Sequence, residues 1–269
     1  MKPAAFDYAR PRTRREAIDL LVDAGSQARI LAGGQSLMAV LNMRLAEPGL
    51  VIDITGVDDL HYIEERNGAL CVGAATRQAE LAAHPGLAER VPLVARALPW
   101  VGHFQTRNRG TVCGSIAHAD PSAELPLCLA SLGGEVVLET RRGRQRVVPA
   151  AEFFQGVLTT ARGPEELIIE VRFPLVRTGV DYRFTEVAMR HGDFAIVALA
   201  AALDPDQVRL GVGGVADRPV VQTLPRADGL ADALNELAWA LGAEDDPHAS
   251  AAYRRQLVRE LGYRLVTEG

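Results

Sequence analysis

The first stretch whose residues could do chemistry runs from Ile30 to Leu41 and reads ILAGGQSLMAVL. A short apolar run stops at Gly33 and Gly34, and Gln35 and Ser36 then open a second apolar run with helical spacing. This order predicts a strand, a tight turn and a helix start. Adjacent glycines allow close backbone approach, and the first N–H groups of a helix lack internal partners. The pattern suits an anion such as a phosphate, although a strand-to-helix turn without a ligand fits equally well.

A second glycine-rich stretch lies between Thr106 and Pro126 and reads TRNRGTVCGSIAHADPSAELP. Gly110 and Gly114 flank a short segment, and Thr111 and Ser115 supply hydroxyl groups beside backbone amides. Small and polar residues leave little for a core to bury here, so we expect a loop shaped around a ligand. Two amide-rich turns in one chain of this size suggest a diphosphate held from both sides.

The composition of the 269 residues, with 48% hydrophobic and 23% charged, is that of a soluble globular protein. The net charge of −5 argues against a nucleic-acid partner. The longest apolar run, Ala195 to Leu203, is too short to span a bilayer, and we see no signal peptide. Three scattered cysteines offer neither a zinc site nor an iron–sulfur cluster. Their sparse, odd number is typical of the reducing cytoplasm.

Residues 1–56 are predicted to form a compact β-α-β unit. A capping box at Thr13 to Glu16 opens a helix that Gly25 would end. Strands are expected at Arg29 to Leu31 and Leu50 to Ile54, joined through a helix over Ser36 to Arg44. A ligand in such a unit sits at the C-terminal ends of the strands, where the first glycine pair lies.

Residues 57–176 are predicted to form an α+β part on an antiparallel sheet. Hairpins are expected around Arg66 to Gly68 and Arg141 to Arg144. Thr76 could cap a short helix that includes Leu81 to Ala83, and Leu167 to Phe173 is a further strand that stops at Pro174.

Residues 177–269 are predicted to combine antiparallel strands with helices. The segments Phe184 to Met189 and Phe194 to Leu203 fit either two strands or a strand and a helix. Val208 to Val212 returns as a strand, and the glycines from Gly211 onward fit a turn. Two helical stripes follow, made of Leu230, Ala233, Leu234 and Leu237, and of Tyr253, Leu257, Leu261 and Leu265.

Three segments together resemble a known family, the FAD-binding medium subunits of molybdenum hydroxylases. They are AGGQS at Ala32 to Ser36, TVCGS at Thr111 to Ser115 and RHGDFAIV at Arg190 to Val197. The family includes carbon monoxide, nicotine, caffeine and aldehyde dehydrogenases and the flavin domain of xanthine dehydrogenase. The likeness covers nearly the whole chain, from Phe6 to Pro11 at its start to the terminal helix.

The resemblance implies an α+β chain with the vanillyl-alcohol-oxidase (PCMH)-type fold, in which FAD lies between the first two parts. Backbone amides of both glycine stretches would hold the pyrophosphate. Glu124, or Asp120 before it, would hydrogen-bond the adenosine side, and Val101, Gly102 and Leu167 would pack near the flavin ring. The implied cofactor-binding residues are Ile30, Leu31, Ala32, Gly33, Gly34, Gln35, Ser36, Leu37, Val101, Gly102, Thr111, Gly114, Ser115, Ala117, Asp120, Glu124 and Leu167.

Two positions depart from the pattern of some relatives. Cys113 stands where they have glycine, and a side chain there is tolerated only if its φ is negative. We favour inert packing for this thiol over a redox role. Thr185 and Glu186 occupy the region where several relatives place a lysine near the flavin, so the positive charge that would stabilise reduced flavin is missing.

Several other groups allow more than one interpretation. His118, Asp120 and Glu124 could bind a metal, but we favour hydrogen bonding to cofactor or loop. Arg107 and Arg109 could contact phosphate, anchor their loop or face a partner. The arginines from Arg141 to Arg146 fit a solvated hairpin tip, and Asp193 fits a cap for the segment after it.

The function that the resemblance implies is electron transfer. A large partner with a molybdenum cofactor would hydroxylate the substrate, and a small partner with two 2Fe–2S clusters would pass electrons to FAD on this chain. We expect a heterohexamer made of two heterotrimers in the cytoplasm, with no catalytic side chain and no metal on this chain. Three alternatives are a stand-alone FAD oxidase, a Rossmann-type NAD dehydrogenase, which would need G-x-G-x-x-G, and a non-catalytic nucleotide-binding scaffold.

Overall fold

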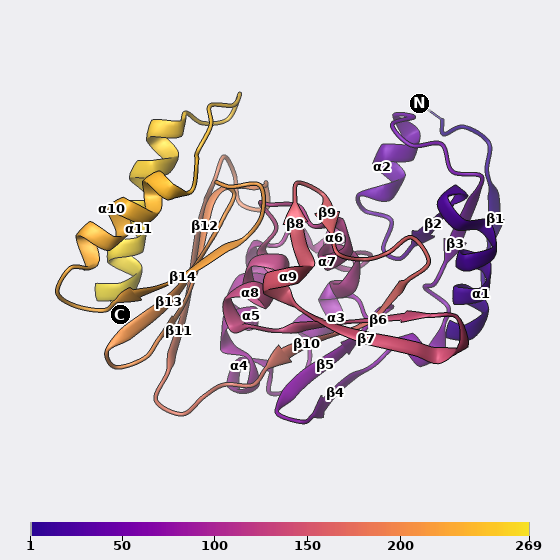
Figure 1. Ribbon diagram of the computed structural model, residues 1–269, viewed down its shortest axis with the longest axis horizontal. Helices are drawn as coiled ribbons and strands as arrows, with labels where there is room; N and C mark the ends of the chain where they lie inside the picture. The colour runs from indigo at the N-terminus through magenta and orange to yellow at the C-terminus, as the bar shows by residue number, and fades with distance from the viewer. Residues whose placement is uncertain (1, 269) are drawn as a thin grey trace.

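A computed structural model describes residues 2–268, which form three main β-sheets with helices packed around them (Figure 1). The chain passes through the sheets in sequence order, from the N-terminal lobe on the right of Figure 1 to the C-terminal helices on the left. A two-stranded ribbon, β8 (Phe154–Gly156) with β9 (Thr159–Thr160), stands above the middle of the molecule.

The N-terminal sheet has three parallel strands in the order β1-β3-β2. They are β1 (Asp7–Ala9), β2 (Ala28–Leu31) and β3 (Leu50–Asp53), with α1 (Arg14–Ala24) and α2 (Leu37–Asn42) between them. The predicted β-α-β unit is present, but strand β1 was not predicted, because three residues are too few to show a period. Thr13 caps α1 by accepting from the Glu16 N–H, while the Glu16 carboxylate accepts from the N–H of Arg12.

The central sheet has five antiparallel strands in the order β4-β5-β10-β6-β7. Both predicted hairpins and the long strand are confirmed; Asn67 and Gly68 have positive φ, as a tight two-residue turn requires. The strands are β4 (Ile63–Arg66), β5 (Ala69–Gly73), β6 (Glu135–Thr140), β7 (Arg144–Pro149) and β10 (Leu167–Pro174).

Short helices pack against the central sheet and link its strands. They are α3 (Gln78–Ala82), α4 (Leu87–Arg90), α5 (Pro92–Ala97), α6 (Phe104–Arg107), α7 (Val112–His118), α8 (Glu124–Leu132) and α9 (Ala150–Phe153). The predicted cap at Thr76 is wrong. Its hydroxyl bonds to the backbone of Tyr62, and the helix starts after Arg77, whose N–H donates to Glu80.

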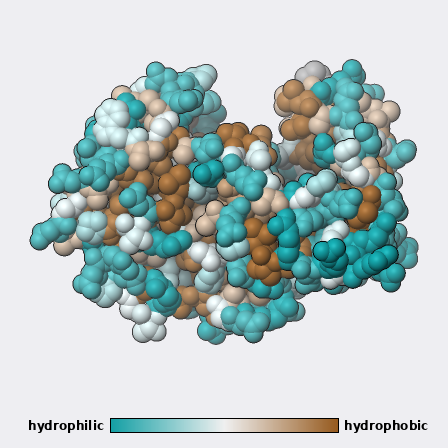
Figure 2. Space-filling model, viewed as in Figure 1, coloured by the Kyte–Doolittle hydropathy of each residue, from teal (hydrophilic) through white to brown (hydrophobic). Residues whose placement is uncertain are grey.

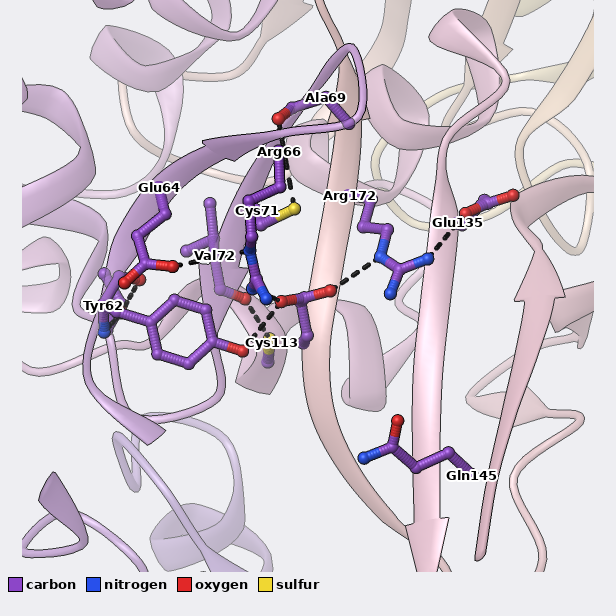
Figure 3. A network of polar contacts seen from close by, with 12 residues as sticks. Tyr62, Glu64, Arg66, Ala69, Cys71, Val72, Cys113, Glu135, Gln145 and Arg172 are labelled. Carbon is purple, nitrogen blue, oxygen red and sulfur yellow. Dashed lines mark hydrogen bonds and ion pairs between the residues drawn. The ribbon is translucent and has the colours of Figure 1, made fainter. Parts of the chain in front are cut away.

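Polar residues on β10 alternate with its apolar residues, so they face away from the core. Glu170 is buried there and accepts from Arg172 of the same strand and from Tyr62 and Arg66 at the two ends of β4 (Figure 3). A buried carboxylate needs such partners to offset its desolvation. This network therefore ties β4 to β10, and through the pair of Arg172 with Glu135 also to β6, and is a structural element of the sheet.

The C-terminal sheet has four antiparallel strands in sequence order: β11 (Asp181–Ala188), β12 (Ala195–Leu203), β13 (Gln207–Gly213) and β14 (Val220–Pro225). The open choice between strand and helix for the apolar run is settled, because β12 is a strand with all nine residues buried. Strand β14 was not predicted, since its exposed residues hide the alternation.

Helices α10 (Leu230–Ala240) and α11 (Ala251–Thr267) cover the outer face of the C-terminal sheet (Figure 1). Both were predicted, but the buried stripe of α11 is one residue away from the expected one. Arg254, Val258, Gly262 and Val266 are buried, while Leu257, Leu261 and Leu265 lie at the edge of the core. Gly262 permits this contact, because a Cβ there would come within 2.8 Å of the Leu234 side chain.

The opposite face of the C-terminal sheet packs against α5 and α8 of the central part. Gly211 and Gly213 lie within β13, so the predicted turn at Gly211 is wrong and only Gly214 leaves the strand with a positive φ. A Cβ on Gly211 would overlap the Ser131 hydroxyl, and one on Gly213 would lie 3.3 Å from Leu127. These glycines therefore let α8 lie directly on the sheet.

Strand β12 contributes to two separate cores. Ala198, Ala200 and Ala202 belong to the large core that fills the central part, whereas Leu199 and Leu203 belong to the core beneath α10 and α11. Successive side chains of a strand point to opposite faces, so one strand serves both layers.

Candidate functional site

The two glycine stretches lie in direct contact, although Gly33 and Gly110 are 77 positions apart in sequence. A Cβ on Gly33 would lie 2.5 Å from the Cα of Gly110 and would overlap the carbonyl of Arg109. A Cβ on Gly114 would lie 3.7 Å from the Cβ of Ala32. Only a residue without a side chain allows the first of these contacts, so the backbone of one stretch rests on the backbone of the other.

The first stretch presents a run of hydrogen-bond donors. Gly34 has φ +72°, and α2 begins after Ser36. Within residues 2–268, none of the N–H groups from Gly33 to Leu37 donates to a protein acceptor, and the first that does is that of Met38, to the Gly34 carbonyl. Five consecutive backbone donors without protein partners therefore lie at a helix start, an arrangement typical of anion-binding nests.

The second stretch differs from the loop that was predicted, because most of it is helical. Thr111 caps α7 by accepting from the Gly114 N–H at 3.0 Å, and the Val112 and Ser115 N–H groups bond to the carbonyls of Thr76 and Thr111. The small side chains that suggested a loop around a ligand allow α7 to pack closely against its neighbours instead. The second stretch therefore offers fewer donors than expected, and its main contribution is the backbone surface beneath Gly33.

Cys113 lies in the first turn of α7, where its φ is negative and its side chain is buried. Burial raises the pKa of this thiol far above its ordinary value, with a smaller contribution from Glu170. Its sulfur lies 3.6 Å from the carbonyl of Val72. The side chain is thus an unreactive part of the packing between α7 and β5, which is the interpretation favoured from sequence.

Gln78 supports the second stretch and was missed by the sequence analysis. Its N–H donates to the Gly110 carbonyl at 2.8 Å, and a Cβ on Gly110 would lie 3.0 Å from its Oε1. That Oε1 is buried and has no hydrogen-bond partner among the described residues. A polar residue at the start of a short helix gives no signal in the sequence that would identify this contact.

Gly102 borders a hollow of about 330 Å³ at the start of the second glycine stretch. It is lined by Gly102, His103, Phe104, Gln105, Arg107 and His191. Arg107 anchors its loop, since its guanidinium donates to the carbonyls of Val101 and Gly102 at 2.8 and 2.9 Å. Of the three roles considered for this arginine, the structure shows the anchor.

The turn between β11 and β12 closes the other side of this hollow. The ring of His191 lies 5.2 Å from that of Trp100, and a Cβ on Gly192 would lie 2.8 Å from His103. Asp193 accepts from Arg190 at 3.0 Å and so closes its own turn, which corrects the predicted cap for the next segment. The third segment of the resemblance thus reaches the central part.

Glu124 and Glu186 are two buried carboxyl groups on elements that pack together. Glu124 opens α8, and burial with the nearby Asp120 raises its pKa to about 7, opposed by Arg107. Glu186 lies on β11, and burial with the nearby Glu124 raises its pKa to about 8. Both oxygens of Glu186 lack a hydrogen-bond partner among residues 2–268. A glutamate at one inward position of a strand is the only signal that the sequence carries for it.

The remaining predicted residues lie around the same region with different exposure. Ile30 and Leu31 end β2, Ser36 is half-buried, and Gln35 and Ala117 are exposed. Leu167 is buried at the start of β10, opposite Glu139 of β6. In the part of the chain that the structure describes, no three His, Cys, Asp or Glu side chains are placed to hold a metal ion.

Two of the four arginines of the β6–β7 hairpin pair with acids of other segments, so the predicted solvated tip is correct only for the exposed Arg142 and Arg144. Arg141 pairs with Asp19 and Asp23 of α1, so it joins the hairpin to the N-terminal lobe. Arg146 pairs with Glu166 at 2.6 Å across the loop before β10.

A notch opens at the top of the molecule between the upper part of the N-terminal lobe and the rest, and hydrophobic residues gather on both of its sides (Figure 2). The exposed apolar side chains of the chain include Leu45 after α2 and Val157 between β8 and β9, at 72% and 58%. Over residues 2–268, no helix has the length and apolar character needed to cross a bilayer.

Comparison with known families covers almost the whole chain. The family described as the FAD binding domain in molybdopterin dehydrogenase matches residues 4–176. The family described as the CO dehydrogenase flavoprotein C-terminal domain matches residues 182–268.

Individual relatives agree with this. The chain is 36% identical to the nicotine 6-hydroxylase medium subunit of Paenarthrobacter nicotinovorans, over 100% of this chain and 98% of that one. It is 35% identical to the 6-hydroxypseudooxynicotine dehydrogenase complex subunit alpha of the same organism, over 100% and 95%.

Solved structures show the same fold. Reconstituted CO dehydrogenase from Oligotropha carboxidovorans matches with a TM-score of 0.93 at 30% identity, over 99% of this chain and 98% of that one. Quinoline 2-oxidoreductase from Pseudomonas putida 86 matches with a TM-score of 0.90 at 32% identity, over 99% and 97%. The contacting glycine stretches, the fold and the full-length matches together establish that this chain belongs to the FAD-binding medium subunits of molybdenum hydroxylases, an oxidoreductase family.

Proposed function

We propose that this chain holds FAD as the electron-transfer centre of a molybdenum hydroxylase complex. It receives electrons from the iron–sulfur clusters of a small partner and passes them to an external acceptor such as NAD, a quinone, a cytochrome or oxygen. The observation that carries this proposal is the contact of Gly33 with Arg109 and Gly110, beside five backbone N–H groups that have no protein partner among the described residues.

The donor set fits the pyrophosphate of FAD. Backbone N–H groups from Gly33 to Leu37 would bind its oxygens, and the neutral amides suit a doubly charged anion without a basic side chain. The backbone of Gly110 to Gly114 would form the second wall. FAD supplies the redox chemistry when bound, and the protein supplies position and electrostatics.

We assign the parts of the chain accordingly. Residues 1–56 and 57–176 would hold the cofactor between them, and residues 177–269 would close the ring end through the turn at His191. Val101, Gly102 and Leu167 would contact the ring. Arg107 donates to the carbonyls of Val101 and Gly102 and also lies near Glu124. Because Val101 and Gly102 would contact the ring, we place Glu124 near the ring end of the cofactor and not near its adenosine end.

The partners that we propose are a large subunit with the molybdenum cofactor and a small subunit with two 2Fe–2S clusters, assembled as two heterotrimers in the cytoplasm. Homologues of this chain are medium subunits of multi-subunit enzymes. Phe104, Met189 and Phe194 stand 63–70% exposed near the hollow that would hold the ring. Large exposed apolar side chains of this kind are typical of an interface, and an electron donor must approach the ring closely.

The competing functions make different demands. A stand-alone oxidase needs a substrate site of its own, and the site described here offers none beyond the shallow hollow. A non-catalytic scaffold would bind FAD but would not exchange electrons. Reduction of bound FAD by the reconstituted small subunit, or by NADH, separates the electron-transfer subunit from such a scaffold.

The first experiment is the visible absorption spectrum of the purified chain, followed by chromatography of any ligand released on denaturation. We expect flavin bands and release of FAD. A matched pair of variants then tests the site: Gly33→Ala should lose FAD, whereas Gly49→Ala should keep it, because a Cβ on Gly49 meets only ordinary contacts. A colourless chain that takes up no FAD, alone or with its partner subunits, would overturn the proposal.

A further inference from the structure

A short segment outside both glycine stretches runs along one edge of the second stretch. It comprises residues 76–80, and we call it the support segment. Arg77 pairs with Thr111 in an antiparallel β-bridge. Next to this pair, the N–H of Gln78 donates to the carbonyl of Gly110 at 2.8 Å. The second stretch is therefore held along this edge by backbone pairing.

The pairing also sets the direction of a backbone donor. The N–H of Val112 donates to the carbonyl of Thr76 at 3.0 Å, so Thr111 lies between two residues that bond to the support segment. In an antiparallel pair, a residue in this position directs its own N–H away from the partner segment. The N–H of Thr111 donates to no acceptor among residues 2–268, and neither does that of Cys113. Both groups therefore remain available to a ligand.

The side chain of Gln78 limits how far Gly110 can move. Gln78 is 5% exposed, and a Cβ on Gly110 would lie 3.0 Å from its Oε1 and 3.3 Å from its Cδ. The carboxamide thus occupies the space into which a side chain at position 110 would project. Because its Oε1 has no hydrogen-bond partner in the described chain, this oxygen supports Gly110 by its volume and not by a hydrogen bond.

Gly110 links the support segment to the first glycine stretch. A Cβ on Gly33 would lie 2.5 Å from the Gly110 Cα, whereas the Cβ direction of Gly110 itself leads to Gln78. First stretch, second stretch and support segment therefore form a continuous series of contacts. Closely packed atoms transmit a displacement, since protein interiors contain few voids. A smaller side chain at position 78 would let Gly110 move away from Gly33.

The support segment is itself fixed near both ends. The hydroxyl of Thr76 is buried; it donates to the Tyr62 carbonyl at 2.9 Å and accepts from the Tyr62 N–H at 3.2 Å. At the other end, the carboxylate of Glu80 accepts from the Arg77 N–H at 2.7 Å and lies 2.9 Å from Nε2 of His61. Both anchors come from the two residues before β4, so the segment can act as a fixed support.

We propose that Gln78 is a positioning residue for the flavin cofactor, and that its side-chain volume sets the spacing of the two glycine stretches around the pyrophosphate. Gln78 acts through Gly110, while the backbone pairing of the support segment directs the Thr111 N–H. This inference rests on the proposed function, whereas the contact between Gln78 and Gly110 is a property of the chain without cofactor.

The first test varies the volume at position 78 in the full chain, together with its partner subunits if FAD binds only in the complex. Flavin fluorescence titration measures the affinity. Gln78→Ala removes the support, and we expect FAD to bind about tenfold more weakly. Gln78→Met keeps the volume without the unpartnered oxygen, so it should bind FAD as the unaltered chain does. Gln222→Ala, the same change at an exposed position of β14, is the matched control and should leave the affinity unchanged.

Two results of this titration would overturn the proposal. If Gln78→Met loses as much affinity as Gln78→Ala, the polar group and not the volume is what matters. If folded Gln78→Ala binds FAD as tightly as the unaltered chain, Gln78 does not position the site, although the proposed function still stands.

The second test examines the contact itself, without cofactor, by urea denaturation. Gly110→Ala places a Cβ against the carboxamide and should lower the urea midpoint. The same change should lower it less in the Gln78→Ala chain, because the space is vacant, although the Thr106 carbonyl still lies 3.0 Å from that Cβ. Equal effects in both chains would overturn the proposal. Coupled effects in a chain that binds no FAD, alone or with its partners, would contradict the proposed function and the positioning role and leave only the contact.

Discussion

Glycines permit close contact in two regions of this molecule, with opposite outcomes. At Gly33 the missing side chain lets one backbone rest on another, and the N–H groups beside it have no protein partner among the described residues. At Gly211 and Gly213 it lets the side chains of Ser131 and Leu127 fill the space. Under the proposed function a ligand would complete the first region, whereas protein side chains fill the second. The N–H groups without protein partners beside Gly33, and not the close contact alone, distinguish the two regions.

The largest effect is expected from Gly33→Ala. The added Cβ meets backbone atoms of Arg109 and Gly110, which cannot rotate away, so the two stretches must separate. A cost of about 3 kcal/mol in binding corresponds to FAD affinity about a hundredfold weaker. Flavin fluorescence titration measures the affinity. An unchanged Kd would show that the contact does not shape the binding site.

A change in the other region should affect folding and not binding. Gly211→Ala forces the Ser131 hydroxyl aside, at a cost of about 1–3 kcal/mol in the free energy of unfolding. Urea denaturation measures this cost. Adding Ser131→Ala should restore part of the stability, since that hydroxyl is buried and has no partner in the described chain, while the contacts with Leu127 and the Cβ of residue 131 remain. Weaker FAD binding in a folded Gly211→Ala protein would remove the distinction between the two regions.

Gly114→Ala is expected to have an intermediate effect. Its Cβ would lie 2.6 Å from Oγ1 of Thr111, which caps α7 through the Gly114 N–H. The side chain can rotate, so the main loss is the hydrogen bond of the cap, about 1 kcal/mol. If this cost falls on FAD binding, the affinity is about fivefold weaker. Thr111→Ala alone should cost a similar amount by the same titration. A loss as large as that of Gly33→Ala would mean that the two walls contribute equally.

The effect that depends on pH is expected from the acid in the sheet contact. The pKa of Glu186 is raised from an ordinary 4.5 to about 8 in the folded chain, so the folded state binds its proton more tightly. Stability is therefore full below about pH 4.5 and falls as pH rises toward 8. Glu186→Gln should flatten this decline in thermal melts between pH 5 and 9. If stability declines equally in the Glu186→Gln protein, other titrating groups cause the pH dependence.

Much of the fold follows from local sequence signals. The turn at Asn67 and Gly68 and the capped start of α1 at Thr13 are fixed by residues next to one another, so both were predicted. Strands β1 and β14 were missed, since one has only three residues and the other is mostly exposed. Helix α7 was read as a loop, because small residues serve equally in loops and in closely packed helices.

Part of the site was also predictable, because its glycine motifs are local sequence signals. The glycine motifs were visible, and the resemblance joined them, but the contact between Gly33 and Gly110 spans 77 positions of sequence. The support from Gln78 and the burial of Glu186 depend on how sheets and helices pack, which no local pattern encodes. Tertiary contacts determine the surroundings of Gln78 and Glu186, whereas the sequence shows only which residue types they are.

Strand β12 makes the C-terminal part inseparable from the rest of the protein. Its Ala198 and Ala200 belong to the core of the central part, while its Leu199 belongs to the core under α10 and α11. A chain shortened to the matched range of residues 4–176 would leave Leu127 and its neighbours on α8 facing water, and such a surface promotes aggregation. Exchanging C-terminal parts between relatives would succeed only if the glycine and alanine face of the sheet is exchanged together with α8.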